Sequence, residues 1–496
     1  MNRYDVLIIG SGLSGLSCGL MLAKEGKSVC IVERHNVIGG CLQSFNRRGY
    51  CFDTGVHYVG SLDEGQIMRQ YIRYYGIEDK IELQRLDEDA FEIINISGKE
   101  YRLALGRERY VQSLINYFPQ ESEGIRKFVD LVMKVKESIS VELLREGQIN
   151  RDDYSYYMSV SLNEVICSHV KDEDLRGVLA GSSLLYGGEK ETSPFYVYAM
   201  VAGTNLEGAY KFIGGSQKMA NAMVEKIRDY GGEIIVGNGV RHMGVDEGSI
   251  SYAELDNGER IVANTYISTL HPKLTFDIVE HKLPIKKAYR TRLAELKNTF
   301  GVFTVYIGLK PNAKRYNNSY IYIHRSSDTW SSEEKVLRGD WSLLAGEQPY
   351  EDKKWTKSIE LIIPIYKSQT DRWQDSHIGK RGETYKQWKN NLVEECLRRY
   401  EQRYGSIRDA IDYIETSSPL TYRDYTGTPD GTAYGVMKSC INPLPTMFSV
   451  RTKLSNLLLS GQSLYVHGII GVTMTATLTC AELLGNEYLA KRITEV

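Results

Sequence analysis

The chain has 496 residues, of which 42% are hydrophobic and 25% are charged, and its formal net charge is -2. This balance argues against a nucleic-acid-binding protein, which would usually carry an excess of basic residues. The composition is ordinary for a soluble globular protein, and the length predicts two domains or one large composite domain.

Metal-binding and hydrolase motifs are missing from the sequence. The eight cysteines are scattered without CxxC spacing, and the nine histidines include no HExxH. We therefore expect no metal site, and reduced thiols in a cytoplasmic protein. The first predicted strand starts at Tyr4, which leaves no room for a signal peptide. No stretch approaches the roughly 18 uninterrupted apolar residues of a membrane span.

The first forty residues contain the most informative pattern. Residues 4–9 form an apolar run that predicts a buried strand, and Gly10-x-Gly12-x-x-Gly15 follows directly. A helix is predicted over residues 13–25 and a second strand over residues 28–32, which Glu33 ends. This order of strand, glycine turn, helix, strand and acid predicts a dinucleotide site.

Each glycine of this turn has a predicted role. Gly10 allows the tight turn, Gly12 lets a pyrophosphate approach the backbone, and Gly15 lets the helix lie close to the sheet. The start of the helix offers free N–H groups and a partial positive charge to the diphosphate. Glu33 is placed to accept hydrogen bonds from ribose hydroxyls. The predicted contacts at this end are completed by Leu13, Ser14 and Arg34.

A second glycine loop distinguishes between dinucleotides. Gly39-Gly40-Cys41-Leu42 comes just after the second strand, where an NAD dehydrogenase would normally begin another βαβ unit. Here the sequence resembles FAD-dependent oxidoreductases with the glutathione-reductase-like fold, in which such a loop passes the ribityl chain. The resemblance implies flavin contacts by Gly40, Cys41, Leu42, Gly55, Val56 and His57. Cys41 is interpreted as a small packed residue rather than as a point of covalent flavin attachment.

The middle of the chain is predicted to leave and then rejoin the dinucleotide domain. The apolar stripe from Ile125 to Ile139 indicates a core helix, with lipid contact as the alternative, and residues 193–201 favour a buried helix over a substrate channel. A helix over residues 214–229 and strands over 233–236, 240–246, 249–255, 260–262 and 266–270 resume the domain. By resemblance, Val240 contacts the adenine, and Thr269 is a further predicted contact. Residues 310–357 are read as a charged, loop-rich region without a motif.

The end of the chain is predicted to close the cofactor site. Residues 456–460 form an apolar run that must return to the first sheet, which makes the dinucleotide domain discontinuous. A helix over residues 474–484 follows, and a start near Gly471 would direct its positive end at the flavin pyrimidine edge. The predicted contacts here are Gly461, Gln462, Gly468, Ile469, Gly471, Val472 and Thr473. The predicted division is an FAD-binding domain of residues 1–75, 212–282 and 425–496, and an α+β substrate-binding domain of residues 76–211 and 283–424.

With these motifs in place, the whole chain resembles the carotenoid desaturase and retinol saturase family of FAD enzymes. The most telling segment is Ser418-Pro419-Leu420-Thr421 with residues 425–431 and Tyr434-Gly435, while residues 53–60 look closer to the retinol saturase branch. The resemblance implies hydride transfer between the flavin and a carbon–carbon bond of a lipophilic, isoprenoid-like substrate. His57 and His467 are the titratable groups expected nearest the flavin, to exchange a proton or only to form hydrogen bonds. Animal retinol saturases carry an N-terminal membrane signal, and we expect none in this protein.

Several alternatives stay open at this point. An amine-oxidase-like flavoprotein would act on a polar amine, and a non-catalytic prenyl-lipid carrier of the same architecture would bind no flavin. Electrons could come from transiently bound NAD(P)H, or from a protein or quinone donor, and the direction of reaction is not chosen. A lipid-dissolved substrate implies peripheral membrane contact, expected near Phe195 or the helix from Ile125. The oligomeric state is not predicted.

Overall fold

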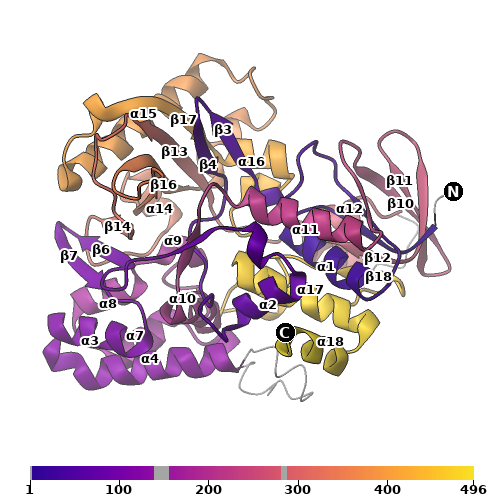
Figure 1. The fold of residues 1–496 in the computed structure, drawn as a ribbon, viewed down its shortest axis with the longest axis horizontal. Coiled ribbons are helices and arrows are strands. Elements are labelled where there is room, and N and C mark those ends of the chain that lie inside the picture. The colour runs from indigo at the N-terminus through magenta and orange to yellow at the C-terminus, as the bar shows by residue number, and fades with distance from the viewer. Residues whose placement is uncertain (1–2, 139–155, 281–286) are drawn as a thin grey trace.

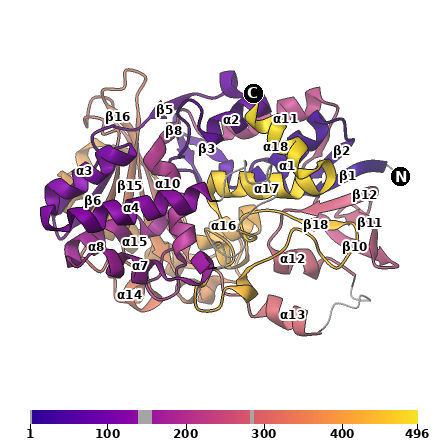
Figure 2. The same cartoon turned by 90° about the horizontal axis from the view of Figure 1, so that it is seen from below.

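The structure is a computed structural model that describes residues 3–138, 156–280 and 287–496. In this part of the chain, two seven-stranded sheets with their flanking helices form two adjoining halves (Figure 1). The half that contains the glycine turn also contains the C-terminal helices, as Figure 2 shows from below.

The first sheet is mostly parallel and forms the dinucleotide half. Six of its strands follow the order β10-β11-β12-β1-β2-β9. The seventh, β18, pairs with β12. The strands are β1 (Arg3–Ile9), β2 (Val29–Val32), β9 (Glu233–Ile235), β10 (Val240–Asp246), β11 (Ser249–Leu255), β12 (Arg260–Ser268) and β18 (Leu457–Leu459).

Both faces of this sheet are covered, which explains its continuous apolar runs. On one face, side chains such as Val6 and Ile8 pack against α1 (Leu13–Lys24), α11 (Gln217–Asp229) and α17 (Gly468–Leu484). On the other face, Leu7 and Ile9 pack against the β10–β11 hairpin.

The two ends of the chain meet in this half. Strand β18 pairs in parallel with β12, so that Tyr266 lies opposite Leu457 and Ser268 opposite Leu459. The Ser14 hydroxyl at the start of α1 donates to Ser460 Oγ at 2.7 Å, across 446 positions of sequence. The predicted return of the C-terminal strand is therefore confirmed.

The second sheet forms the other half and has the order β17-β13-β16-β15-β14-β6-β7. Neighbouring strands are antiparallel except β6 and β14, which are parallel. Helix α15 (Gly382–Tyr404) covers one face, and a group of helices that includes α4 (Ser122–Glu137) and α10 (Phe195–Glu207) covers the other. The strands are β6 (Glu92–Ile96), β7 (Lys99–Leu103), β13 (Gly301–Leu309), β14 (Tyr320–His324), β15 (Leu343–Pro349), β16 (Thr356–Ile365) and β17 (Ile411–Ser417).

Shorter elements connect these layers. The remaining strands are β3 (Ser44–Arg47), β4 (Tyr50–Asp53), β5 (Leu83–Arg85) and β8 (Tyr210–Phe212). The remaining helices are α2 (Ile67–Tyr75), α3 (Arg107–Tyr117), α7 (Leu162–His169), α8 (Glu173–Ala180), α9 (Ser183–Tyr186), α12 (Pro272–Asp277), α13 (Lys287–Ala294), α14 (Glu333–Leu337), α16 (Pro419–Thr426) and α18 (Asn486–Thr494).

Three sequence predictions of elements need correction. Helix α17 begins at Gly468 rather than at residue 474, β12 is one strand where two were expected, and β15 lies inside the region read as loop-rich. Ile139, at the end of the predicted apolar stripe, lies outside the described residues. The boundaries of the two domains remain a prediction.

The predicted places of lipid contact are part of the core. Ile125 and Phe195 are each 0% exposed, so neither the stripe of α4 nor the start of α10 offers an apolar surface. The core reading of both helices is therefore correct. Most of the largest fully buried side chains in the described ranges are tyrosines, so many of the 35 tyrosines serve the interior.

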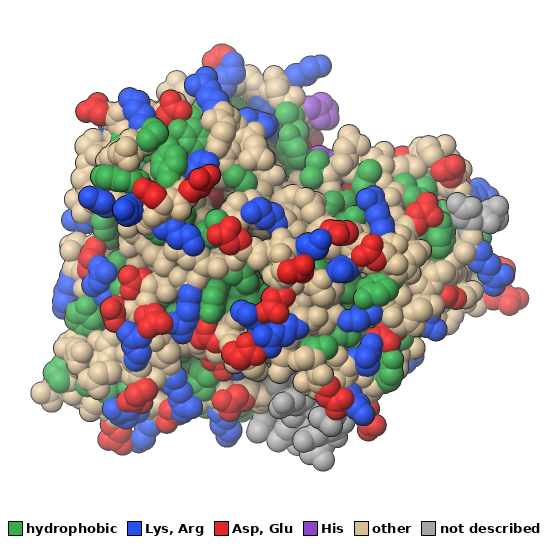
Figure 3. All heavy atoms as spheres, in the orientation of Figure 1, with side chains coloured by type: hydrophobic (Ala, Val, Ile, Leu, Met, Phe, Trp, Pro, Cys, Tyr) green, Lys and Arg blue, Asp and Glu red, His purple; other side chains and the backbone are tan. Residues whose placement is uncertain are grey.

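The surface drawn in Figure 3 carries acidic and basic side chains side by side, in keeping with the small net charge. Within the described residues, no helix combines the length and the apolar character needed to cross a membrane.

Candidate cofactor and substrate site

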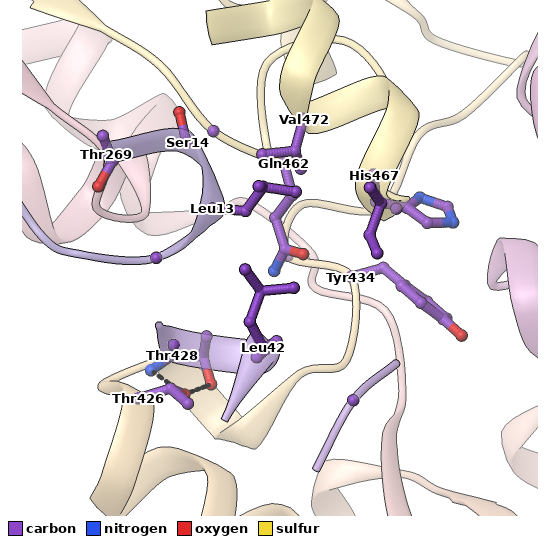
Figure 4. A pocket seen from close by; sticks show the side chains of 18 of the residues that line it. Leu13, Ser14, Leu42, Thr269, Thr426, Thr428, Tyr434, Gln462, His467 and Val472 are labelled. Atoms are coloured by element: carbon purple, nitrogen blue, oxygen red, sulfur yellow. Dashed lines mark hydrogen bonds between the residues drawn. The ribbon is translucent and has the colours of Figure 1, made fainter. Parts of the chain in front are cut away.

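A cavity of about 530 Å³ lies where the two halves meet. Its walls include the glycine turn after β1, the loop after β2, residues 55–60, and the C-terminal segment that leads into α17. Ligands of open parallel sheets bind at the carboxyl ends of the strands, and β1 and β2 end here. Figure 4 shows side chains from both ends of the chain pointing into this space, among them Leu13, Leu42 and Gln462.

The glycine turn has the geometry of a phosphate-binding loop. Gly10 has a φ of +99°, which favours glycine. A Cβ atom at Gly15 would lie 1.9 Å from the carbonyl oxygen of Gly10, so helix and turn touch directly. Gly12 has an ordinary φ of -63°, and a Cβ atom there would meet no protein atom within 4 Å. Neither conformation nor protein packing requires glycine at position 12, so the open space in front of it fits a close-lying diphosphate.

Glu33 is oriented by the backbone that surrounds it. Its Oε2 accepts hydrogen bonds from the Ser11 N–H at 2.9 Å and from the Ser11 hydroxyl at 2.7 Å. Its Oε1 accepts from the His35 N–H at 2.8 Å. The carboxylate lines the cavity, as do Arg34 and Val240. This arrangement fits the expected hydrogen bonds from a ribose to Glu33.

The loop after β2 packs closely on the glycine turn. A Cβ atom at Gly40 would lie 3.1 Å from the Cα of Gly12, and one at Gly55 would lie 3.1 Å from the Cβ of Cys41. Burial raises the pKa of the Cys41 thiol to about 11, which keeps it protonated and a weak nucleophile. The predicted packing role of Cys41 is the one that this environment favours.

The first turn of α17 forms the C-terminal wall of the cavity. Gly468, Ile469, Gly471 and Val472 line it, with Gly461 and Gln462 before them. A Cβ atom at Gly471 would lie 2.6 Å from the Val466 carbonyl oxygen, so a larger residue would push the helix off this loop. The first N–H groups of a helix lack partners within the helix and give this end a partial positive charge.

His467 and Tyr434 form a fixed pair at the same end. Their ring centroids are 4.2 Å apart. His467 Nε2 donates to the Leu185 carbonyl at 3.0 Å, and the Tyr434 hydroxyl donates to the Leu184 carbonyl at 2.7 Å. Burial lowers the pKa of His467 to about 4, so its imidazole is neutral near pH 7.

His57 lies in a similar environment. Burial lowers its pKa to about 4, and its Nδ1 has no hydrogen-bond partner among the described residues. Both predicted catalytic histidines thus line the cavity as neutral rings. A neutral ring is a hydrogen-bonding group rather than a ready source of protons at pH 7.

The predicted cofactor contacts converge on this cavity, with two exceptions. Gly15 and Thr473 lie behind its wall. Thr473 is 0% exposed and its Oγ1 has no partner among the described residues. The predicted residues that line the cavity are Gly10, Gly12, Leu13, Ser14, Glu33, Arg34, Gly40, Cys41, Leu42, Gly55, Val56, His57, Val240, Thr269, Gly461, Gln462, His467, Gly468, Ile469, Gly471 and Val472.

Apart from Met200 and Val201, which lie in the segment weighed as a channel, the sequence did not single out the side chains of the apolar end. Besides Tyr58, this end is lined by Leu185, Met200, Val201, Val302 and Val466. They come from α9, α10, β13 and the segment before α17, which are far apart in sequence. Helix α10 is a core helix, as predicted. Its Met200 and Val201 also line the cavity, which agrees with the alternative that residues 193–201 form part of a substrate channel.

Comparison with known proteins decides the family. The model of the flavin containing amine oxidoreductases matches residues 13–311, which include the start of α1, the loop after β2 and α10. The chain belongs to this family. As a member of this flavoprotein family it is a flavin-dependent oxidoreductase, which confirms the prediction of a flavoenzyme, and FAD is the flavin that the dinucleotide turn fits.

The names of two relatives of this chain indicate that those proteins act on isoprenoid-type molecules. The chain is 26% identical to the all-trans-retinol 13,14-reductase of Danio rerio, over 98% of this chain and 86% of that protein. It is 24% identical to prolycopene isomerase 1 of an Oncidium hybrid cultivar, over 88% of this chain and 76% of that protein. These similarities agree with the resemblance found in the sequence.

Similarity to a solved structure confirms the fold. An oxidoreductase from Methanosarcina mazei superimposes with a TM-score of 0.64 at 15% identity, over 96% of this chain and 99% of that chain. The predicted glutathione-reductase-like α/β fold, with a discontinuous dinucleotide half and a second sheet-containing half, is thereby confirmed.

Proposed function

We propose that the protein is an FAD-dependent oxidoreductase that saturates or desaturates a carbon–carbon bond of a lipophilic, isoprenoid-like substrate. One observation carries the proposal: the cavity that begins at the dinucleotide turn ends in a wall of Leu185, Met200 and Val201. The names of the retinol reductase and prolycopene isomerase relatives support this substrate class.

The cofactor would be held along the whole cavity. Ser14 and Gly12 would face the diphosphate, Glu33 the ribose, and Val240 the adenine. The first turn of α17 would face the pyrimidine edge. Bound FAD supplies hydride transfer between its N5 position and a carbon of the substrate.

The protein's own part in the reaction is to exclude water and to position the double bond. Apolar side chains from α9, α10 and β13 line the end where His467 and Tyr434 lie. Such a wall binds a polyene by burying its apolar surface, at roughly 25 cal/mol per Å². A dry, oriented complex is what hydride transfer to a hydrocarbon requires. A polar amine would bury its charge against this wall, so the amine-oxidase alternative has no better support.

The electron donor is a further part of the proposal. NAD(P)H acting transiently is one candidate, and a protein or quinone donor is the other. Anaerobic mixing of the oxidised holoprotein with NADPH separates them, because only a nicotinamide donor would bleach the flavin without any other component.

We also propose peripheral membrane contact by the loop of residues 438–447, in place of α4 and α10. Ile441 and Leu444 are 72% and 78% exposed. The Lys438 ammonium donates to the Ser463 carbonyl at 2.7 Å, which joins this loop to the cavity wall. A lipid-dissolved substrate could therefore pass from a bilayer to the cavity near this loop.

A single-turnover experiment tests the proposed function. The FAD-loaded protein is reduced by light without oxygen and mixed with a panel of polyenes and enones. We expect one of them, such as all-trans-retinol, to restore the oxidised flavin spectrum and to gain two hydrogens. The oxidised protein is mixed with the same panel, because a desaturase would instead be reduced by its substrate. A flavin whose redox state no compound of the panel changes contradicts the proposal.

A further inference from the structure

We propose that Tyr58 delivers the proton that saturation of a carbon–carbon bond requires, and that Glu92 replaces this proton through its hydrogen bond to Tyr58. This inference rests on the proposed function. It assigns a proton donor to a cavity in which both predicted catalytic histidines, His57 and His467, are neutral.

Tyr58 is held at the cavity by its neighbours. It lines the apolar end beside His57. The Tyr320 hydroxyl of β14 donates to the His57 carbonyl at 2.7 Å, and the rings of Tyr58 and Tyr320 have centroids 4.6 Å apart. Backbone hydrogen bonds between Val59 and Tyr210 fix the next residue. The Tyr58 ring is therefore a rigid part of the wall.

The Tyr58 hydroxyl points away from water into a hydrogen-bonded pair. It donates to Glu92 Oε1 while that carboxyl group is ionised and accepts from the carboxyl group once it is protonated, and it lies 2.7 Å from the Tyr322 hydroxyl. Glu92 is the first residue of β6 and is 6% exposed. In the parallel pairing of β6 with β14 it lies opposite Tyr320. Sheet pairing thus places the Glu92 carboxyl group beside β14, whose Tyr322 and Tyr320 are hydrogen-bonded to Tyr58 and His57.

The surroundings of Glu92 are unusual for a carboxyl group. It forms no ion pair within the described part of the chain, and the titratable groups that face it are tyrosines: Tyr58, Tyr110 of α3, Tyr186 of α9, Tyr198 of α10 and Tyr322 of β14. Burial without a cation disfavours the ionised form and raises the pKa of Glu92 to about 7. The group can therefore hold a proton and release it near neutral pH.

The proposed step balances in atoms and electrons. The reductant is the two-electron-reduced flavin, which provides a hydride for one carbon of the double bond. As the second carbon gains its new C–H bond, the O–H bond of Tyr58 breaks. The Tyr58 oxygen takes the proton of the Glu92 carboxyl, whose O–H bond breaks in turn, and Glu92 regains a proton from solvent. Hydrogen bonding from Tyr322 stabilises the transient negative charge on Tyr58.

Three matched variants test the relay in the single-turnover reaction. Tyr58→Phe keeps the ring and removes the donor, so we expect a rate about 10²- to 10⁴-fold lower with little change in substrate affinity. Glu92→Gln keeps the size and hydrogen bonding but cannot resupply the proton. Tyr198→Phe makes the same small change at a tyrosine that faces Glu92 outside the relay, and its rate should stay near that of the unmodified protein.

The pH dependence separates a relay from a structural role. The unmodified protein should lose rate as the pH rises through about 7, because Glu92 must be protonated, whereas Glu92→Gln should lose this dependence. The infrared band of a protonated carboxyl should disappear over the same pH range in the unmodified protein and be missing in Glu92→Gln, without any substrate. Unchanged rates in both relay variants, or a band that does not titrate there, overturn the relay while leaving the proposed function intact. If no polyene changes the redox state of the flavin in the unmodified protein, both fall.

Discussion

Two glycines of the same turn, Gly12 and Gly15, have separable tasks. A methyl group at position 12 meets no protein atom within 4 Å, whereas at position 15 it meets the Gly10 carbonyl oxygen at 1.9 Å. We therefore expect Gly12→Ala to fold normally and to lose FAD affinity, because its methyl group enters the space left for the diphosphate. Gly15→Ala should instead lower the free energy of unfolding of the apoprotein, by about 1–3 kcal/mol for an overpacked site.

Urea unfolding of the apoproteins and fluorescence titration with FAD measure these two effects separately. If Gly12→Ala bound FAD as tightly as the unmodified protein does, the diphosphate would not lie against this turn.

Glu92 also links stability to pH. Its pKa rises from an ordinary value of 4.5 to about 7 on folding, so the folded protein holds the proton more tightly than the unfolded chain. The stability that this proton contributes is present below the unfolded pKa and is lost as the pH rises through the folded pKa. Glu92→Gln removes this single contribution.

We expect the stability of the unmodified protein, relative to Glu92→Gln, to fall as the pH rises from about 4.5 to about 7. Urea midpoints of both proteins across this range give the comparison. A difference that is constant, or that grows with pH, would mean that Glu92 is ionised in the folded protein.

At the scale of single residues, the sequence predicted what short-range spacing determines. Gly10, Gly12 and Glu33 lie within one βαβ unit, whose geometry is known from its pattern. Tyr58 and Glu92 meet because Tyr58 packs against Tyr320 and Tyr322 of β14 and β14 pairs with β6, and no local pattern predicts these contacts. The proton relay is therefore visible in the structure alone.

At the scale of elements, strand β18 holds the C-terminal segment on the first sheet. Leu459 is 2% exposed and pairs with Ser268 of β12. Leu459→Ala should lower the free energy of unfolding by about 2–5 kcal/mol, the usual cost of a buried leucine, and should reduce FAD content because the next residues line the cavity. Leu337→Ala, at a side chain 59% exposed on α14, is the control and should change stability by less than about 0.5 kcal/mol.

Chemical unfolding and the flavin-to-protein absorbance ratio give both values. If Leu459→Ala kept full stability and full FAD content, β18 would not be the element that closes the site.

Element boundaries were predicted well where the apolar period was regular and less well elsewhere. The run before Ser460 gave β18 correctly, while α17 starts six residues before residue 474 because its first turn is rich in glycine and isoleucine. Strand β15 contains Gly346, Glu347 and Gln348, which carry no strand signal; its neighbours β14 and β16 supply the pairing. Tertiary contacts decided both cases.

At the scale of the whole molecule, the exposed loop of residues 438–447 is the expected contact with lipid. The double variant with Ile441→Asp and Leu444→Asp should no longer float with liposomes. Its FAD binding should be unchanged, since both side chains lie outside the cavity. Leu337→Asp, at another exposed leucine, should float as the unmodified protein does. Equal flotation of the double variant, or no flotation of the unmodified protein in any salt condition, would contradict membrane contact by this loop.

The whole account depends on one arrangement: both ends of the chain enclose one FAD, and segments of the second half wall a lipophilic substrate against it. The most direct measurement is a density map of the FAD-loaded protein with a bound polyene. We expect the diphosphate at Gly12, the flavin ring between His57 and the first turn of α17, and the polyene along Met200 and Val201. A flavin ring outside this cavity, or a polyene bound away from it, would contradict the account.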